Sequence, residues 1–413
     1  MRTKLFPRAL GLAALVGLTA CESLTGPGAA RKPLTALPRE LSAAERSVIS
    51  ASNRFAFGLL REVDRADTAS NVFISPLSAS MALGMTLNGA RGATRDEMRA
   101  TLGFGTTPMD EVNASYRSLI DLLRGLDRGV EMRIGNSIWA RQGYPFEEAF
   151  FQTGRKYFDA EVSTLDFGAP SAPATINAWV DRSTNGKIKT IVTSIPGNVV
   201  MYLINAIYFK GAWTEPFDPR MTRQAPFTRA DGTRQQVRMM NRKAPVRHLS
   251  GPDFQAVDLP YGRGAFSMTV VLPAQGTDLD ALVARLDAER WQEWTGKFTE
   301  GEMDVYLPRF RIEYEKALNS SLQALGMVTP FGAGADFTGL SPRGLGLHIS
   351  EVKQKTFVEV NEEGTEAAAA TSVSIVESLG PTFRADRPFL VVIRERLSGT
   401  ILFMGKIGAP PAS

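Results

Sequence analysis

The sequence has very little cysteine and histidine. Its 413 residues include one cysteine, Cys21, and two histidines, His248 and His348. A disulfide framework and a structural zinc cluster need more of these residues, so the sequence excludes both, and no metal or cofactor is expected. Neither histidine has a carboxylate or cysteine at ligand spacing, and we interpret both as structural. A hydrolase using a serine with either histidine is a weak hypothesis, because no Gly-x-Ser-x-Gly elbow is present.

Strong net charge is also lacking. The formal charge is +4, and it falls to +1 when Arg2, Lys4 and Arg8, which lie in a segment that we expect to be removed, are not counted. A nearly neutral protein has no general attraction for nucleic acid. With 44% hydrophobic and 22% charged residues, the chain has the composition of an ordinary globular protein, which excludes disorder or a fibrous structure for its bulk.

The N-terminus has one apolar run, residues 9–17, which is too short to span a bilayer. Basic residues precede it and Leu18-Thr19-Ala20-Cys21 follows it, which resembles a bacterial lipobox. We therefore expect a signal peptide over residues 1–20 and lipid modification of Cys21. The alternative is an ordinary signal peptide in which Cys21 is incidental. Glu22 is not the aspartate associated with inner-membrane retention, so we expect an outer-membrane lipoprotein, on the periplasmic or surface face, or an extracellular protein.

Residues 21–41 contain Gly26-Pro27-Gly28 and two further prolines without apolar periodicity, which predicts a flexible lipidated tether. The folded domain is expected over residues 42–413. Ser42 and Glu45 have capping-box spacing, which predicts the start of a first helix. The apolar residues that follow at helical spacing form its predicted buried stripe: Val48, Ile49, Ser52, Phe55, Ala56 and Leu59.

Two segments of the body combine apolar runs with isolated polar residues. Residues 71–80 form a short β-type run that Pro76 interrupts before a helix, and Ser75 and Ser78 at the break are candidate helix caps. Residues 201–213 are apolar on both faces, which predicts a strand in the middle of a sheet. Asn205 lies inside that strand, and a buried amide needs hydrogen-bond partners.

Three further segments complete a pattern: residues 357–371, which include Glu362-Glu363-Gly364-Thr365-Glu366-Ala367-Ala368, residues 386–393, and residues 402–407. Together with the two segments above, they resemble the serpin family, from about residue 43 to 409. The resemblance implies one α+β domain with three β-sheets, eight or nine helices and an exposed reactive-centre loop. It implies a monomeric suicide inhibitor of serine endopeptidases, not an enzyme, with a bait loop over residues 362–388. The alternative is a non-inhibitory, serpin-like binding lipoprotein.

The resemblance also assigns roles to individual residues. Ser75, Ser78 and Asn205 match the cluster at which the family's main sheet opens, and the usual histidine of that cluster is replaced by Gln354. Glutamine still donates and accepts hydrogen bonds but carries no titratable charge. Glu362 matches the hinge glutamate and Arg309 its basic partner, a pair expected to hold the loop end out of the sheet until cleavage. Trp213 lies beside the point where the loop enters.

Insertion of the loop as a central strand imposes a test on its sequence. Such a strand alternates faces, lacks proline and buries small or apolar residues. No proline occurs between Gly364 and Val376, and Glu366–Ala370 is also a good helix former, which suits an exposed state. The alternating set expected to turn inward is Thr365, Ala367, Ala369, Thr371, Val373 and Ile375.

The scissile bond is the least determined feature. Counting from the hinge at Gly364, as family members do, gives Ser378-Leu379, whereas counting back from Pro388 gives Glu377. We favour Ser378-Leu379, because the length of the inserted strand sets how far the protease moves. The small residue predicts elastase- or subtilisin-like targets, and Glu377 would predict a glutamate-specific protease.

The lipobox prediction can be tested by replacing Cys21 with serine. The modifying enzyme needs the thiol, so Cys21→Ser should block processing and leave the precursor in the cell. Detergent partitioning and the mass of the N-terminus measure this. Normal processing of the variant together with lipid partitioning would contradict the lipobox.

Overall fold

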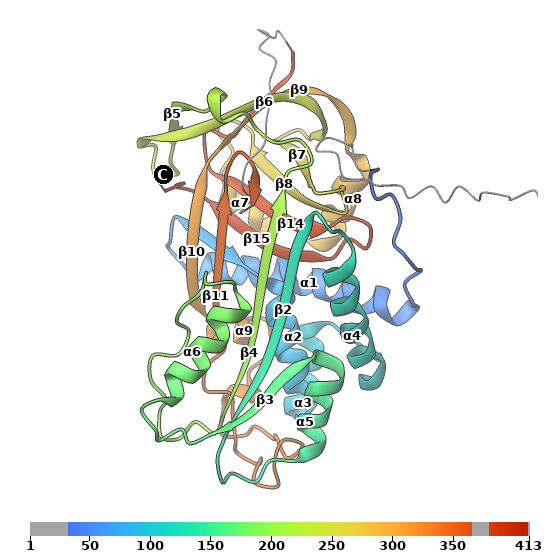
Figure 1. The fold of residues 1–413 in the computed structure, drawn as a ribbon, viewed down its shortest axis with the longest axis vertical. Coiled ribbons are helices and arrows are strands. Elements are labelled where there is room, and N and C mark those ends of the chain that lie inside the picture. Colours follow the sequence, from blue (N-terminus) through green and yellow to red (C-terminus); the bar gives the residue numbers. More distant parts are fainter. Residues whose placement is uncertain (1–31, 366–379, 412–413) are drawn as a thin grey trace, which may run out of the picture. The chain divides into compact units, whose positions relative to one another are not determined.

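The computed structural model describes residues 32–365 and 380–411. Residues from Pro33 onward form a single compact unit. The described residues contain nine α-helices, two short 3-10 helices and fifteen strands (Figure 1). The α+β fold class is therefore confirmed. Within these ranges, no helix combines the length and apolar character needed to cross a membrane.

Six of the nine described α-helices lie in the first half of the chain. Their bounds are α1 Ala43–Arg65, α2 Pro76–Leu87, α3 Gly92–Leu102, α4 Met109–Gly125, α5 Glu148–Phe158, α6 Ala172–Ser183, α7 Leu279–Arg285, α8 Ala288–Lys297 and α9 Asn319–Ala324, with 3-10 helices at Pro219–Met221 and Thr329–Phe331.

The strands alternate with these helices and dominate the second half. Their bounds are β1 Asn71–Ile74, β2 Val130–Arg141, β3 Ala160–Leu165, β4 Met201–Ala212, β5 Arg223–Thr228, β6 Arg234–Ser250, β7 Phe254–Tyr261, β8 Phe266–Pro273, β9 Thr299–Pro308, β10 Phe310–Ala317, β11 Lys353–Val360, β12 Gly364–Thr365, β13 Thr382–Arg384, β14 Phe389–Glu395 and β15 Ile401–Ile407.

Strand β4 lies inside a six-stranded sheet with the order β10-β11-β12-β4-β2-β3. Its alternate residues belong to two separate clusters: Phe209 packs in the main core, whereas Ile204 and Ala206 pack with Trp179 of α6. Helix α2 contacts β4 from the main-core side, and α6 lies across the sheet in Figure 1. The prediction of a central strand that is apolar on both faces is thus confirmed.

The second sheet has nine strands, in the order β1-β15-β14-β8-β7-β6-β9-β13, with β5 also paired to β6. Strand β6 is 17 residues long. Its residues 234–239 pair with β5, residues 239–248 pair with β9, and residues 247–250 pair with β7. The small third sheet that was predicted is therefore present as β5, β6, β9 and β13, but it is joined to the larger sheet through β6.

Helix α1 begins as its sequence predicts. Ser42 is the N-cap, its side chain accepts from the Glu45 backbone N–H, and the Glu45 carboxylate accepts from the Ser42 backbone N–H. The six residues of the predicted stripe are all buried. Ser75 likewise caps α2, because its hydroxyl accepts from the Ser78 N–H.

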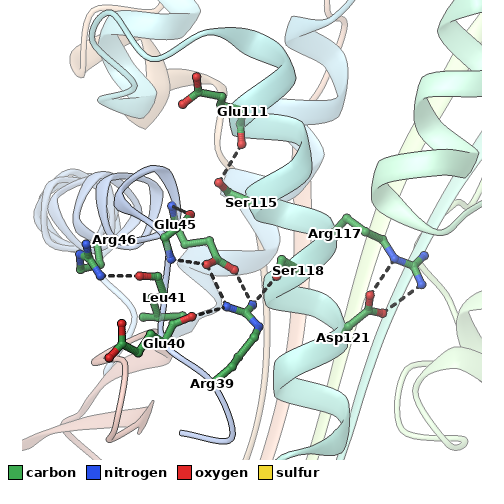
Figure 2. A network of polar contacts seen from close by, with 11 residues as sticks. Arg39, Glu40, Leu41, Glu45, Arg46, Glu111, Ser115, Arg117, Ser118 and Asp121 are labelled. Carbon is green, nitrogen blue, oxygen red and sulfur yellow. Dashed lines mark hydrogen bonds and ion pairs between the residues drawn. The ribbon is translucent and has the colours of Figure 1, made fainter.

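The N-terminal segment contacts the folded domain before residue 41, where the tether was predicted to end. The Leu34 N–H donates to the Arg263 carbonyl at 2.8 Å, and the Leu34 side chain packs against the core. Figure 2 shows Arg39 between the Glu45 carboxylate, at 2.5 and 3.0 Å, and the Ser118 hydroxyl of α4. Residues 33–41 therefore lie on the domain and do not extend the tether to its predicted boundary.

This network predicts a pH-dependent contribution to stability. The hydrogen bonds from Arg39, Ser118 and Ser42 outweigh burial and lower the pKa of Glu45 to about 2. A lowered pKa in the folded state stabilises the fold above the unfolded-state pKa, and this is lost as the pH falls toward 2. Because Arg39 is partly exposed, Arg39→Ala should reduce the free energy of unfolding by only about 1 kcal/mol at pH 7. Urea unfolding should show the difference shrinking below about pH 5, and a difference that grows on acidification would contradict this account.

Candidate functional site at the hinge of the six-stranded sheet

The site is built around β12, the two-residue strand at the end of the described hinge. Gly364 and Thr365 pair with Ala212 and Gly211 of β4, and Thr365 pairs with Val360 of β11 on its other side. In the described residues, β4 and β11 share no direct ladder, so β12 is the link between the two halves of the sheet. The hinge has thus entered the sheet by two residues in the uncleaved chain.

Two glycines make room for this arrangement. Gly364 has φ +150°, and a Cβ there would lie 2.1 Å from the Gly211 carbonyl oxygen. A Cβ on Gly211 would lie 2.9 Å from the Tyr261 ring below the strand. Neither position tolerates a side chain without movement of the backbone or of a buried ring.

Glu362 is held by three groups at the upper end of the sheet. Its side chain is only 5% exposed and lies 3.2 Å from the Arg309 Nε. It accepts a 2.6 Å hydrogen bond from the Thr222 hydroxyl, and its carbonyl accepts from the Phe217 N–H. The predicted pair of Glu362 and Arg309 is present. The expectation that this pair holds the loop end outside the sheet is wrong for Thr365, because a pair at Glu362 leaves the chain free to turn inward three residues later.

Trp213 also holds the hinge. Its indole N–H donates to the Asn361 carbonyl at 3.0 Å, and its backbone N–H donates to the Glu363 carbonyl at 2.8 Å. The ring stacks on Tyr261 with centroids 4.4 Å apart and an interplanar angle of 11°. Trp213 therefore combines core packing with direct contacts to the hinge.

The four predicted sheet-opening residues lie near one another, but they do not form one closed network. Gln354 accepts from the Ser75 N–H at 2.9 Å and donates to the Ser75 carbonyl at 2.8 Å. The Ser78 hydroxyl reaches the Asn205 carbonyl at 3.5 Å, and the Asn205 amide donates to Asn136 at 2.6 Å. The Asn205 Oδ1 is buried without a hydrogen-bond partner. Ser75 and Gln354 form one pair, and Asn205 keeps an open acceptor.

A cavity of about 340 Å³ lies between the lower parts of β4 and β11. Residues 201–205 of β4 and residues 350–354, the last two of which begin β11, line it, and Ser78 and Ala82 of α2 are also in its lining. Asn205 and Gln354 both border this space. The cavity therefore has both polar and apolar walls, and it lies where the two strands are not joined.

Several predicted residues lie outside the described part of the chain: Cys21, Ala367, Ala369, Thr371, Glu377, Ser378 and Leu379. Their assignments stay predictions.

Of the two histidines, His348 is exposed, and each ring contacts a backbone carbonyl two residues earlier. The described residues contain no cluster of three or more metal-ligating side chains.

No pattern in the sequence indicates Thr222 and Tyr261 as contacts of the hinge. Thr222 contacts Glu362 from 140 positions away, and Tyr261 contacts Thr365 from 104 positions away. Tyr261 is the last residue of β7 and precedes Gly262, which indicates a strand end but not the residue that its side chain meets. The hydrogen bonds depend on the packing of one sheet on the other.

A family model described as Serpin (serine protease inhibitor) matches residues 50–410. Leukocyte elastase inhibitor of Sus scrofa is 36% identical over 376 residues, which cover 87% of this chain and 99% of the relative. Human thyroxine-binding globulin complexed with thyroxine aligns with a TM-score of 0.82 and 31% identity, over 89% of this chain and all of the other. The native state of tengpin, a thermophilic serpin, aligns with a TM-score of 0.81 and 29% identity, over 92% and 97%.

The buried carboxylate of Glu362 predicts an asymmetric effect of mutation. Arg309→Met leaves that carboxylate with one neutral side-chain donor, so the free energy of unfolding should fall by about 1–3 kcal/mol. The double variant Arg309→Met/Glu362→Gln should lose less than the sum of the two single variants, because no buried charge is then left unpaired. Urea unfolding measures each value.

A matched control is Lys243→Met, which removes an exposed lysine 3.7 Å from Glu302. A surface pair of this kind contributes little, so its effect should be within about 0.5 kcal/mol. An Arg309→Met effect no larger than that of the control would contradict the role assigned to the pair.

Proposed function

The chain belongs to the serpin family, and from this membership and the geometry of its hinge we propose that it is a suicide inhibitor of serine endopeptidases with a bait loop over residues 362–388. The observation that carries the proposal is β12. A strand that has begun between β4 and β11 has a defined path for continuing, and the next five residues are one glutamate and four alanines, with no proline.

The register of β12 supports the predicted inward set. Gly211 and Val360 flank Thr365. Continued at the same register, residue 371 would lie between Asn205 and Gln354. A threonine hydroxyl there could donate to the open Asn205 Oδ1. The cavity between the strands supplies space at that level.

Insertion of the cut loop as a strand would also be favourable in free energy. The facing edges of β4 and β11 share no direct ladder in the described residues. A new central strand would form backbone hydrogen bonds on both sides and bury apolar surface. The inhibitor would therefore store free energy that is released only after its loop is cut.

In the proposed reaction, the serine of the target attacks the carbonyl carbon of the scissile bond. An ester forms between the protease and the loop, and the new amino end of the chain departs. The hinge side of the loop then inserts and carries the esterified protease with it. Inhibition results if insertion is faster than hydrolysis of the ester.

We infer an elastase- or subtilisin-like target from the small residue Ser378 at the favoured scissile bond. The similarity to leukocyte elastase inhibitor agrees with this class. Glu377, the alternative, would direct the bait to a glutamate-specific protease.

The signal segment and Cys21 lead us to propose an exported bacterial lipoprotein, attached to the membrane through lipid alone, with a monomeric inhibitory domain.

A non-inhibitory binding role is the alternative, and thyroxine-binding globulin shows that a close structural neighbour can bind a small ligand. The hinge argues against that role here. The segment from Glu366 to Ala370 carries four alanines and no proline or bulky side chain, so nothing in its sequence would obstruct insertion.

The deciding experiment incubates the purified protein with a panel of serine proteases, including elastase, subtilisin and a glutamate-specific enzyme, and resolves the products on denaturing gels. A covalent complex with at least one protease supports inhibition, and mass spectrometry of the released C-terminal fragment identifies the scissile bond. Clean cleavage within the loop by every protease that cuts it would support the non-inhibitory alternative.

Replacing Thr365 with arginine should convert the inhibitor into a substrate. Thr365 lies in the sheet, is 3% exposed, and its side chain contacts the Tyr261 hydroxyl. An unpaired guanidinium in that place would cost several kcal/mol. The loop should be cut at the same bond, but the ester should hydrolyse before insertion. Gel densitometry should show the yield of covalent complex falling at least tenfold, and an unchanged yield would rule out insertion through this position.

A further inference from the structure

Tyr261 makes a contact with the hinge that neither the sequence pattern nor the proposed reaction assigns. Its hydroxyl lies 2.6 Å from the Thr365 Oγ1. Both residues are buried, Tyr261 completely and Thr365 to 3% exposure. This is a side-chain hydrogen bond between the nine-stranded sheet, at the end of β7, and the first inward-facing residue of the hinge.

The position of the Tyr261 hydroxyl is fixed by its surroundings. The ring stacks on Trp213 and meets Phe209 edge-on at 5.1 Å. The chain on either side is bound to the end of β4, because the Gly262 N–H donates to the Ala212 carbonyl and the Thr214 N–H donates to the Pro260 carbonyl. These contacts hold the phenol ring against the end of β4, so the hydroxyl is fixed at the place where it meets Thr365.

The ring also depends on a missing side chain. It lies directly beneath Gly211, the residue of β4 that pairs with Thr365, and any Cβ at Gly211 would clash with it. The glycine lets the phenol pass under the strand and reach the hinge. Burial raises the pKa of Tyr261, so the hydroxyl keeps its proton and can donate to Thr365.

We propose that Tyr261 is a positioning residue for insertion: its hydroxyl docks Thr365 in the sheet before the loop is cut. Insertion then starts from a strand that has already been initiated, and the docking equilibrium sets the share of cleavage events that end in a trapped protease. The second part of this inference rests on the proposed inhibitory function, whereas the docking itself does not.

Two variants remove the bond from opposite ends. Tyr261→Phe keeps the aromatic stack and loses the hydroxyl, and Thr365→Val keeps the shape of the hinge residue and leaves the phenol without a partner. Each variant should raise the ratio of undocked to docked hinge by roughly fivefold, which is the usual effect of losing one net hydrogen bond. Thr365→Ser keeps a hydroxyl and should restore docking.

A matched control is available in Tyr116→Phe. Tyr116 is also completely buried, and its hydroxyl lies 2.6 Å from the Ser80 hydroxyl. The control loses the same group at the same burial from the contact between α4 and α2. It should destabilise the fold to a similar extent without releasing the hinge.

Amide hydrogen exchange measured by mass spectrometry on the full chain tests docking without any protease. Tyr261→Phe and Thr365→Val should each speed exchange at Gly364 and Thr365 roughly fivefold, with β15 as an internal reference that does not change. The double variant should exchange no faster than either single variant. Tyr116→Phe and Thr365→Ser should exchange at the wild-type rate at these two positions.

The number of inhibitor molecules consumed per trapped protease tests the functional part. It should rise for Tyr261→Phe and Thr365→Val and stay at the wild-type value for Tyr116→Phe and Thr365→Ser. Equal exchange at the hinge in Tyr261→Phe and Tyr116→Phe, or unchanged consumption in Tyr261→Phe, would overturn the assignment. If the wild type trapped no protease at all, the proposed inhibitory function would fail while the exchange experiment still decided docking.

Discussion

The structure depends on an incomplete sheet. Strands β4 and β11 lie in one sheet but are joined in the described residues only through the two residues of β12. Backbone groups that are buried without partners are costly, so a sheet with an unfilled position tends to close or to accept another strand. The cavity of about 340 Å³ along the lower parts of these strands is the space that such a strand would fill. Stability of the intact form therefore depends on the groups that hold both edges in place.

Those groups come from outside the sheet. On the α6 side, the segment after the helix spans the two edges: the Asn185 side chain donates to the Tyr208 hydroxyl of β4 at 3.2 Å, and the Lys187 ammonium lies 5.2 Å from the Phe357 ring of β11. At the hinge, Glu362 and Trp213 form the contacts described above. These are mostly single hydrogen bonds and ring contacts, each of which contributes about 1 kcal/mol. Contacts of this strength can hold the two edges in place, and the larger number of backbone hydrogen bonds of an inserted strand would still outweigh them.

Periodicity and capping explain what could be predicted from the sequence. The α1 stripe follows from helical spacing and from the Ser42 and Glu45 capping box, both of which are local. The central position of β4 follows from apolar residues on both faces. The pairing of Glu362 with Arg309 came from the family resemblance. What could not be predicted was the state of the hinge. Whether Thr365 lies inside or outside the sheet depends on Tyr261, a residue of the other sheet, and no pattern near either residue shows that they meet.

The substitution of Gln354 for the family's usual histidine changes how the sheet-opening cluster can be controlled. Gln354 uses its amide oxygen and its amide nitrogen on the two backbone groups of Ser75, which ties β11 to the cap of α2. An amide has no proton to gain between pH 5 and 8, whereas a histidine in the same place would titrate there. In the proposed insertion, opening of this sheet would therefore be governed by competition for hydrogen bonds and not by charge at this position. The open acceptor on Asn205, which borders the same cavity as Gln354, would give a strand inserted by the proposed mechanism a hydrogen-bond partner at any physiological pH.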